Sequence, residues 1–462
     1  MNKITAKPVT PTLASRASAC LHSWRQECFA DPARKRAPDA SLQKIMDRGL
    51  EHERRLVATL KGVEEVAFDG DWAKGIAATL ELMRKNVPWI YQGVLAAEGI
   101  RGRPDLLQRT ETGYIPVDVK SHKGAKGTDK VQLAVYARLL GLLLGEEPVL
   151  GRIWDAQDLF HDVDLARFRK QRDALLERMA AVGENKEPTQ ALHCGACEIC
   201  PWYDLCEESW IPGESLTLVR GAAKSTVEKL QAAGIKTVRD LLAASPEAVA
   251  KKTKLKLQSL ETLQVHARAS AEGKPVALKK AKFPSGLPIY FYDVETFEGL
   301  TYLHGAIRME GKKREERTFF AARPEEAADA WKAFLDWVSR DEKAVVYTWT
   351  GYENGCLKDL RERFGADEAA YGRLWSSLVD MKVWVERHWA LPVRSYSIKK
   401  VAPVFGFSWQ AEDAGGLNSE IWYADWLKTG DPALRTKVLE YNLDDVRAME
   451  RIYEGLKKDF PS

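Results

Sequence analysis

Residues 102–121, GRPDLLQRTETGYIPVDVKS, decide the fold of the N-terminal part of the chain. Two strand-like segments, GRPDLLQ and GYIPVDVKS, flank the turn-like TETG, which is the pattern of an antiparallel hairpin. Side chains alternate along a strand, so Asp118 and Lys120 project to one face, where the neighbouring strand can place Asp105 beside them. We therefore expect three charged groups to converge on one side of this hairpin.

Such a convergence would give the hairpin a specific chemistry. Two clustered carboxylates offer oxygen ligands that suit Mg²⁺ or Mn²⁺, and a nearby lysine can position an attacking water or offset charge that develops on a phosphate. These are the requirements of phosphodiester cleavage. The alternative is an exposed hairpin with ordinary surface charges, because Asp-x-Lys alone occurs often by chance.

The neighbouring helices supply three more candidates. A helix is predicted from about residue 130 to 144, and Gln132 and Tyr136 lie four residues apart on it. They share a face and could hold the substrate backbone. His52, in the segment RGLEHERRL on an earlier predicted helix, could be a further metal ligand, although a histidine without other support is more often a surface residue.

In their order along the chain, these residues resemble the motifs of PD-(D/E)XK nucleases of the RecB type, including the CRISPR-associated exonucleases with an iron–sulfur centre. The resemblance spans most of residues 1–212. It implies metal binding by His52, Asp105 and Asp118, catalysis by Lys120 together with the two aspartates, and DNA contacts by Gln132 and Tyr136.

A cysteine cluster follows the predicted nuclease core. Cys194, Cys197, Cys200 and Cys206 form C-x2-C-x2-C-x5-C, a density that free structural cysteines rarely reach. Four local thiolates would suit tetrahedral zinc, and a [4Fe–4S] cluster also needs four, so the spacing alone leaves both open.

The family resemblance favours the iron–sulfur cluster. RecB-type iron–sulfur nucleases have one cysteine near the N-terminus and three after the core, which implies Cys20, Cys197, Cys200 and Cys206 as ligands. Cys194 would then be spare, and Cys28 and Cys356 are interpreted as ordinary packed thiols. A cluster that joins Cys20 to Cys197 would clasp the two ends of the domain together, so its role would be structural.

Residues 215–273 are predicted to be helical throughout. They resemble a degenerate helix-hairpin-helix segment, in which a glycine-containing turn presents backbone N–H groups to a phosphate. The hairpin around Gly234 has the typical Gly-Ile-x-Thr-Val-x-Asp-Leu, whereas the earlier one, around Gly221, lacks the usual second glycine. Such modules bind the DNA backbone without reading sequence. The alternative is a helical spacer between two domains.

A second acidic site is predicted after the linker GKPVALKKAKFPSGLP. Asp293 and Glu295 share one face of the predicted strand IYFYDVETF, and Tyr441 and Asp445 lie one turn apart on a final helix at about residues 434–456. Glu353 ends the segment YTWTGYE, which we interpret as a strand, a turn and an acid. Converging on one point, these groups could bind two Mg²⁺ ions.

This ordered set, together with SYSIK at residues 395–399, resembles RNase H-like exonucleases of the DEDD type from about residue 288 onward. The resemblance implies metal binding by Asp293, Glu295 and Asp445, while Tyr441 orients the nucleophilic water. The family usually has aspartate where this chain has Glu353, so the metal could be held or displaced there. Two further acids, Asp380 and Asp444, are interpreted as capping or surface residues.

Composition limits the other possibilities. Lys+Arg exceeds Asp+Glu only by 69 to 66, so a nucleic-acid surface must come from local patches and not from an overall positive field. The most apolar stretch, residues 133–145, contains Arg138 and is shorter than the roughly 20 residues that cross a membrane. We expect no membrane partner, and cysteines spaced for metal in a chain without a recognisable export signal predict the cytoplasm.

The sequence therefore predicts an α/β multidomain protein. Residues 1–212 would form a PD-(D/E)XK restriction-endonuclease-like core, residues 213–275 a helix-hairpin-helix-like segment, and residues 276–462 an RNase H-like domain. The predicted function is a metal-dependent DNA nuclease, an exonuclease in repair, recombination or defence. Its partners would be single-stranded DNA or DNA with free ends, and a helicase. The alternatives are a non-catalytic nucleic-acid-binding scaffold and an RNA-processing nuclease.

Overall fold

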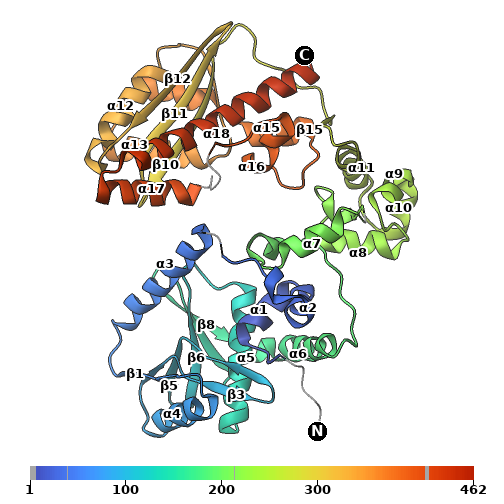
Figure 1. The fold of residues 1–462 in the computed structure, drawn as a ribbon, viewed down its shortest axis with the longest axis vertical. Coiled ribbons are helices and arrows are strands. Elements are labelled where there is room, and N and C mark those ends of the chain that lie inside the picture. Colours follow the sequence, from blue (N-terminus) through green and yellow to red (C-terminus); the bar gives the residue numbers. More distant parts are fainter. Residues whose placement is uncertain (1–6, 39, 213, 411–415, 462) are drawn as a thin grey trace. The chain divides into compact units, whose positions relative to one another are not determined.

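The structure is a computed structural model that describes residues 7–38, 40–212, 214–410 and 416–461. The chain divides into two compact units, Met1–Trp210 and Ile211–Ser462 (Figure 1).

The first unit is built on a six-stranded mixed sheet. Antiparallel pairing of Leu106 with Val117 and of Thr110 with Gly113 forms the predicted hairpin. The second strand of this hairpin, Gly113–Val119, also pairs in parallel with the strand Leu150–Trp154. In spatial order the strands are β1 (Val63–Glu65), β2 (Trp89–Tyr91), β5 (Leu106–Thr110), β6 (Gly113–Val119), β7 (Leu150–Trp154) and β8 (Phe160–Asp164).

Strand alternation gives the two faces of this sheet different neighbours. Ile115 and Val117 of β6 pack in one cluster with Leu56 of helix α3 (Ala40–Val57). The intervening residues point to the opposite face, where helix α5 (Gly127–Leu144) lies against β6. Asp118 therefore faces α5, while α3 approaches from the other side.

The remaining elements of the first unit surround this core. Helix α1 packs on α5, and α2 and α6 contact each other. Their bounds are α1 (Pro11–Ala19), α2 (Leu21–Phe29), η1 (Pro32–Arg34), α4 (Trp72–Arg84), β3 (Leu95–Ala97), β4 (Ile100–Gly102), η2 (Leu165–Phe168), α6 (Arg169–Gly183), η3 (Gly195–Ile199) and α7 (Tyr203–Trp210).

The second unit begins with short helices, as the sequence predicted for residues 215–273. These elements are η4 (Leu216–Leu218), α8 (Lys224–Ala232), α9 (Val238–Ala243), α10 (Pro246–Thr253) and α11 (Leu257–Glu272). The short strand β9 (Val276–Ala277) then pairs with β15 (Trp389–Ala390), which ties the linker to the C-terminal part of the same unit.

A five-stranded sheet forms the core of the second unit. Its first three strands in space are antiparallel and the last two run parallel to the central one. The order is β12 (Lys313–Phe320), β11 (Leu300–Glu310), β10 (Ile289–Phe297), β13 (Val345–Thr348) and β14 (Leu378–Asp380).

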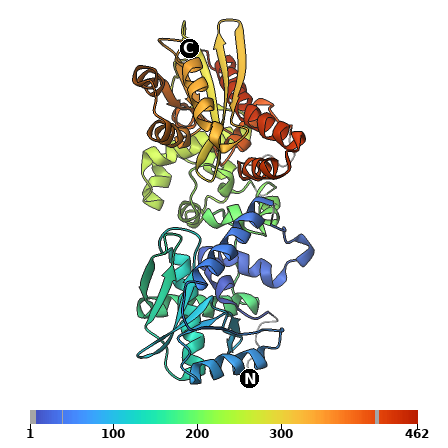
Figure 2. The same cartoon turned by 90° about the vertical axis from the view of Figure 1, so that its left-hand side faces the viewer.

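Helices cover both faces of this sheet (Figures 1 and 2). Tyr290 and Tyr292 of β10 pack with the helices of one face, whereas Phe291 packs with helix α18 on the other. The first face carries α12 (Ala327–Val338), α13 (Tyr352–Phe364) and α14 (Glu368–Ser377). Further elements are η5 (Pro324–Glu326), α15 (Met381–His388), α16 (Ile398–Val401), η6 (Ala402–Phe405), α17 (Gly416–Thr429) and α18 (Pro432–Asp459).

The predicted α/β multidomain architecture is confirmed, with small differences in its elements. The strand at residues 289–297 has the predicted bounds, while the final helix extends two to three residues beyond the predicted ends. Glu353 is not in a turn after a strand but in the first turn of α13, because the chain enters a helix at Tyr352. None of the helices within the described ranges is long and apolar enough to span a membrane.

Candidate active sites

The first site lies where the hairpin of unit 1 meets α5. Asp118 is buried on β6, its Oδ2 lies 2.6 Å from the Lys120 Nζ, and its Oδ1 accepts a 3.2 Å hydrogen bond from the Gln132 amide. Asp105 precedes β5 and accepts a 2.7 Å hydrogen bond from the Val119 N–H. Both predicted aspartates, the lysine and Gln132 are thus brought together.

Burial shapes the charges of this site. It raises the pKa of the Asp118 carboxyl, and it holds the pKa of Asp105 well above its usual range, where the charges of Asp118 and Glu53 add to the effect. Burial alone would lower the pKa of Lys120, but the carboxylates of Asp118 and Asp105 outweigh it and raise that pKa. The lysine stays protonated near neutral pH, so it can offset negative charge.

Helix α3 contributes two neighbouring residues. Glu53 is buried, its carboxylate accepts a 2.9 Å hydrogen bond from the Gln92 amide, and its charge helps to raise the pKa of Asp105. The His52 Nδ1 lies 3.1 Å from the Arg55 guanidinium, while its Nε2 is buried and has no hydrogen-bond partner within the part of the chain that the structure describes. A buried nitrogen of this kind needs a partner, and a bound metal ion would be one.

Tyr136 has a structural contact in this site. Its side chain is 4% exposed, and its hydroxyl donates a 2.8 Å hydrogen bond to the carbonyl of Arg103. That bond fixes the backbone two residues before Asp105. The DNA contact predicted for Tyr136 stays a prediction, as does that of Gln132, whose amide is engaged with Asp118.

The second site lies between the central strand and the last helix of unit 2. Asp293 and Glu295 alternate with the buried tyrosines of β10, so they face α18, which brings Asp445 to the same place. Ligand oxygens of these three acids lie within 4.8 Å of one another, and among the described residues no other set of three potential metal ligands does so. His52, Asp105 and Asp118 are therefore spaced more widely than this triad.

Neighbouring side chains hold each acid of the triad in place. The Asn442 amide donates a 2.8 Å hydrogen bond to Asp293, and the Ser419 hydroxyl donates one to Glu295. Asp445 Oδ1 accepts from two groups at once, the Trp409 indole at 2.6 Å and the Lys399 ammonium at 2.7 Å.

Asn442 reaches Asp293 only because of the residue opposite on β11. Gly305 pairs with Asp293, and a Cβ at residue 305 would lie 1.9 Å from the Asn442 Oδ1. No side chain fits between them, so this glycine is required for the close approach of α18 to the sheet.

Two of the crowded acids of the second site, Glu295 and Asp293, favour their neutral forms. Burial raises the pKa of Glu295 to about 8 and that of Asp293 well above its usual range, and for Asp293 the charges of Glu295 and Asp445 add to the shift. Burial lowers the pKa of Lys399, although the charge of Asp445 opposes it. Lys399 pairs with Asp445, so a divalent cation would supply the further positive charge that Asp293 and Glu295 favour.

Tyr441 lies beside the triad. Its side chain is buried and its ring centroid is 4.4 Å from the Lys399 Nζ. Burial, with the charges of Asp445 and Glu295, raises its pKa. The hydroxyl therefore keeps its proton and is able to donate a hydrogen bond to a bound oxygen.

Three other acids near this site differ in position. Glu353 is buried and its pKa is raised to about 7, chiefly by burial; its charge adds to the raised pKa of Asp293, although it lies outside the triad. Asp380 caps α15, as predicted. The prediction for Asp444 was wrong: it is buried, and it accepts hydrogen bonds from the Gln410 N–H at 2.9 Å and from Arg447 at 3.0 Å.

The predicted cysteine ligands share one cavity in unit 1. It is lined by Cys20, Cys194, Cys197, Cys200 and Cys206, so Cys194 lies with the four predicted ligands. All are free thiols, and thiolates are the ligands of both zinc and iron–sulfur clusters, so the donor set fits either group. Cys28 and Cys356 do not line this cavity.

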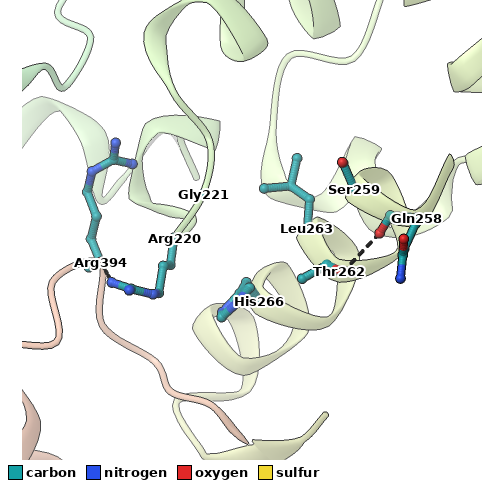
Figure 3. A pocket seen from close by; sticks show the side chains of 8 residues that line it. All are labelled: Arg220, Gly221, Gln258, Ser259, Thr262, Leu263, His266 and Arg394. Carbon is teal, nitrogen blue, oxygen red and sulfur yellow. Dashed lines mark hydrogen bonds between the residues drawn. The ribbon is translucent and has the colours of Figure 1, made fainter. Parts of the chain in front are cut away.

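Two arginines connect the helical segment of unit 2 with its C-terminal part, and both line the pocket that Figure 3 shows. Arg394 donates to the carbonyls of Thr217, Val219 and Ala222, and Arg220 pairs with Glu386 at 2.7 Å. Both line an open cavity of about 640 Å³ beside α11. Because their donors are engaged within the unit, these arginines act as connectors between its two parts.

Sequence reasoning missed several residues that contact the predicted ones. Glu53 lies three positions before the buried Leu56, so helical periodicity could have placed it on the inner face of α3. Asn442 lies next to Tyr441 and three residues before Asp445, so it was within reach of the same argument. Ser419 and Trp409 carry no local signal, because their partners lie far away in the sequence.

Comparison with known proteins identifies two nuclease-related domains in the chain. Residues 6–207 match the family model of the PD-(D/E)XK nuclease superfamily, and residues 290–457 match that of the RNase_H superfamily. No curated protein matches the chain. The two matched regions contain the Asp105–Asp118–Lys120 and the Asp293–Glu295–Asp445 clusters respectively. The chain therefore carries a PD-(D/E)XK nuclease superfamily domain followed by an RNase H superfamily domain, in the order that the sequence predicted.

Proposed function

We propose that this protein is a metal-dependent DNA nuclease, of RecB type in its first domain, that removes nucleotides from single-stranded DNA or from free ends during repair, recombination or defence. The observation that carries the proposal is the convergence of Asp105, Asp118 and Lys120 inside a PD-(D/E)XK superfamily domain. The same proposal includes three domains, at residues 1–212, 213–275 and 276–462, and a location in the cytoplasm.

In the first site, each side chain has a role that its contacts support. His52, Asp105 and Asp118 would hold Mg²⁺ or Mn²⁺, which activates water and polarises the phosphate when bound. Lys120 keeps its proton, so it places positive charge beside the phosphate and does not act as a base. Gln132 orients Asp118, and the buried Glu53 supports the same group of acids from α3.

In the second site, Asp293, Glu295 and Asp445 would hold the metal, and Tyr441 would donate a hydrogen bond to the attacking water. The triad has the spacing for a divalent ion, and Tyr441 is protonated and adjacent. A second candidate function for this domain is nucleic-acid binding without catalysis. It is favoured by the position of Glu353, which is buried outside the triad.

The helical segment suits contact with the DNA backbone. The turn at Gly221 has a positive φ of 84° and leads into α8, whose N-cap residue Ala223 provides no side-chain hydrogen bond. Backbone N–H groups at such a turn can contact a phosphate without reading sequence. We propose that this segment guides the strand, with a helicase as a partner that supplies single strands.

We further propose that the cysteine cavity holds a [4Fe–4S] cluster, with zinc as the alternative. Thiolates around tetrahedral zinc at 2.3 Å are about 3.8 Å apart. Among the described cysteines, no three sulfur atoms lie within 4.8 Å of one another. This wider spacing favours the larger group.

Cleavage of end-labelled single-stranded, double-stranded and circular DNA with Mg²⁺ or Mn²⁺ tests the proposed function. Lys120→Ala should lower the rate roughly 10²- to 10⁴-fold, whereas Lys123→Ala, a change in the exposed loop three residues on, should not. Loss in Lys120→Ala but not in Tyr441→Phe assigns the reaction to the first domain. Residual activity that disappears only in Lys120→Ala/Asp445→Asn shows that both sites cleave.

Two outcomes would contradict the proposal. Wild-type protein without metal-dependent cleavage would favour the scaffold, and cleavage that survives the double variant would come from another protein. Faster cleavage of RNA than of DNA at equal salt would replace the DNA assignment by the RNA-processing alternative. Digestion of linear but not circular DNA is the result expected of an exonuclease.

A further inference from the structure

The cysteine cavity contains one more thiol than a four-thiolate site needs. Cys20 lies between α1 and α2, and the other four cysteines lie within residues 194–206. All five line the same cavity. The motif that implies four ligands assigns no role to Cys194.

Cys194 lies at the centre of this group. Its backbone N–H donates to the Cys197 Sγ at 3.3 Å, and its side chain lines the same cavity as those of Cys20 and Cys197, which both lower the pKa of the Cys194 thiol. Cys200 and Cys206 lie near each other on the η3–α7 segment. A sulfur that lines the same cavity as Cys20, on a residue held by a hydrogen bond to Cys197, is placed to take the position of Cys20.

The two possible ligand sets differ in what they connect. With Cys20, the site joins the start of the domain to residues 197–206. With Cys194 in its place, all four ligands come from one short segment, and the N-terminal helices are no longer tied through the metal. Contacts that need no metal still hold these helices near the site: Trp202 donates to the buried Glu27 at 3.0 Å, and the Arg36 N–H donates to the Pro201 carbonyl at 2.9 Å.

From this geometry we propose that Cys194 and Cys20 are exchangeable ligands for one position of the metal group, so that the domain can hold it in a clasped form and in a local form. The inference rests on the proposed cofactor. In the exchange, the Cys194 sulfur–metal bond forms as the Cys20 bond breaks. The proton of the Cys194 thiol passes to Cys20, and no electrons are transferred.

Metal analysis of five full-length variants tests the exchange: C20S, C194S, C20S/C194S, C200S and, as a control outside the cavity, C356S. Iron, acid-labile sulfide, zinc and visible absorption are measured after anaerobic purification. C194S, C20S and C356S should keep most of the wild-type iron, because each leaves Cys197, Cys200 and Cys206 together with Cys20 or Cys194. C20S/C194S and C200S should lose at least about tenfold, because each breaks every complete set.

Stability separates the two forms. C20S should keep its iron yet unfold at a lower temperature than C194S, since only C194S retains the clasp through Cys20. C20S and C20S/C194S share the loss of Cys20, so a folding defect caused by that loss affects both and cancels in their comparison.

Each remaining outcome decides the matter. C20S with as little iron as C20S/C194S would show that Cys194 cannot substitute, and C194S with as little as C200S would make it an obligatory ligand. A colourless wild-type protein that binds zinc overturns the iron–sulfur proposal. In that case the zinc contents of the same five variants, compared in the same way, still decide the exchange. A wild-type protein that binds neither metal overturns both.

Discussion

Removing one negative charge from the second acidic site should stabilise the metal-free protein. Glu295 has an ordinary pKa of 4.5, and burial raises it to about 8 in the folded chain. Between these values the folded state keeps a proton that the unfolded state has released. The free energy of unfolding therefore falls as the pH rises through this window, and the loss is complete above about pH 8.

The size of the effect follows from the shift. At 1.36 kcal/mol per pKa unit, the full shift of Glu295 corresponds to about 5 kcal/mol. The repulsion is shared with Asp293 and Asp445, so we expect Glu295→Gln to recover about 1–3 kcal/mol at pH 8. The amide has the same shape and can still accept from Ser419. Near pH 4.5, variant and wild type should have equal stability.

Calorimetry of the full chain in EDTA measures this directly. For a unit the size of Ile211–Ser462, about 1–3 kcal/mol corresponds to an increase of roughly 3–10 °C in its unfolding temperature. Saturating Mg²⁺ should stabilise the wild type at pH 8 and have little effect on Glu295→Gln. Glu298→Gln, an exposed glutamate in the turn after β10, is the matched control.

The pH series decides whether the reasoning is right. If Glu295→Gln and the wild type lose stability equally between pH 5 and 8 in EDTA, then Glu295 is not the titrating group. If the variant is less stable than the wild type at pH 8, then the Glu295 carboxylate of the wild type is already neutralised by its surroundings without metal. The proposal that the site needs a cation then fails.

Three further changes test other contacts. Gly305→Ala should destabilise unit 2 by about 1–3 kcal/mol in urea, because the new Cβ collides with the Asn442 Oδ1; unchanged stability would mean that α18 can shift away. Arg394→Lys should increase protease cleavage within residues 215–273, since a single ammonium cannot replace a guanidinium that reaches three carbonyls; equal cleavage rates would contradict this. Glu53→Gln should raise the Mn²⁺ concentration needed for DNA cleavage about tenfold while its circular dichroism spectrum stays unchanged; an unchanged Mn²⁺ requirement would remove Glu53 from the first site.

The sequence could predict contacts that depend on local geometry. Asp293 and Glu295 share a face because strand side chains alternate, and Tyr441 and Asp445 share one because they are a helical turn apart. The two aspartates of the first domain are likewise joined by a short hairpin. Each pairing needs only the type of element and not its position in space.

The rotation and docking of helices could not be predicted in the same way. Consecutive helical residues point about 100° apart, so choosing between His52 and Glu53 as the inward residue requires knowing how α3 is turned. Asn442 meets Asp293 across 149 residues of sequence, and this contact depends on Gly305 opposite it. Cysteine spacing predicts a metal site, but not that Cys194 lies in the same cavity as Cys20.

In each site a lysine forms an ion pair with one of the acids, and this pairing indicates which of the other acids a divalent cation would neutralise. Lys120 pairs with Asp118 at 2.6 Å and Lys399 with Asp445 at 2.7 Å, which offsets one buried negative charge in each case. One ammonium serves one carboxylate. Among the described residues no lysine forms an ion pair with Asp105 or Asp293, and burial with their acidic neighbours holds the pKa of each well above its usual range. These two aspartates therefore mark the positions at which a divalent ion would relieve the most repulsion. Asparagine at either should weaken metal binding without destabilising the metal-free protein.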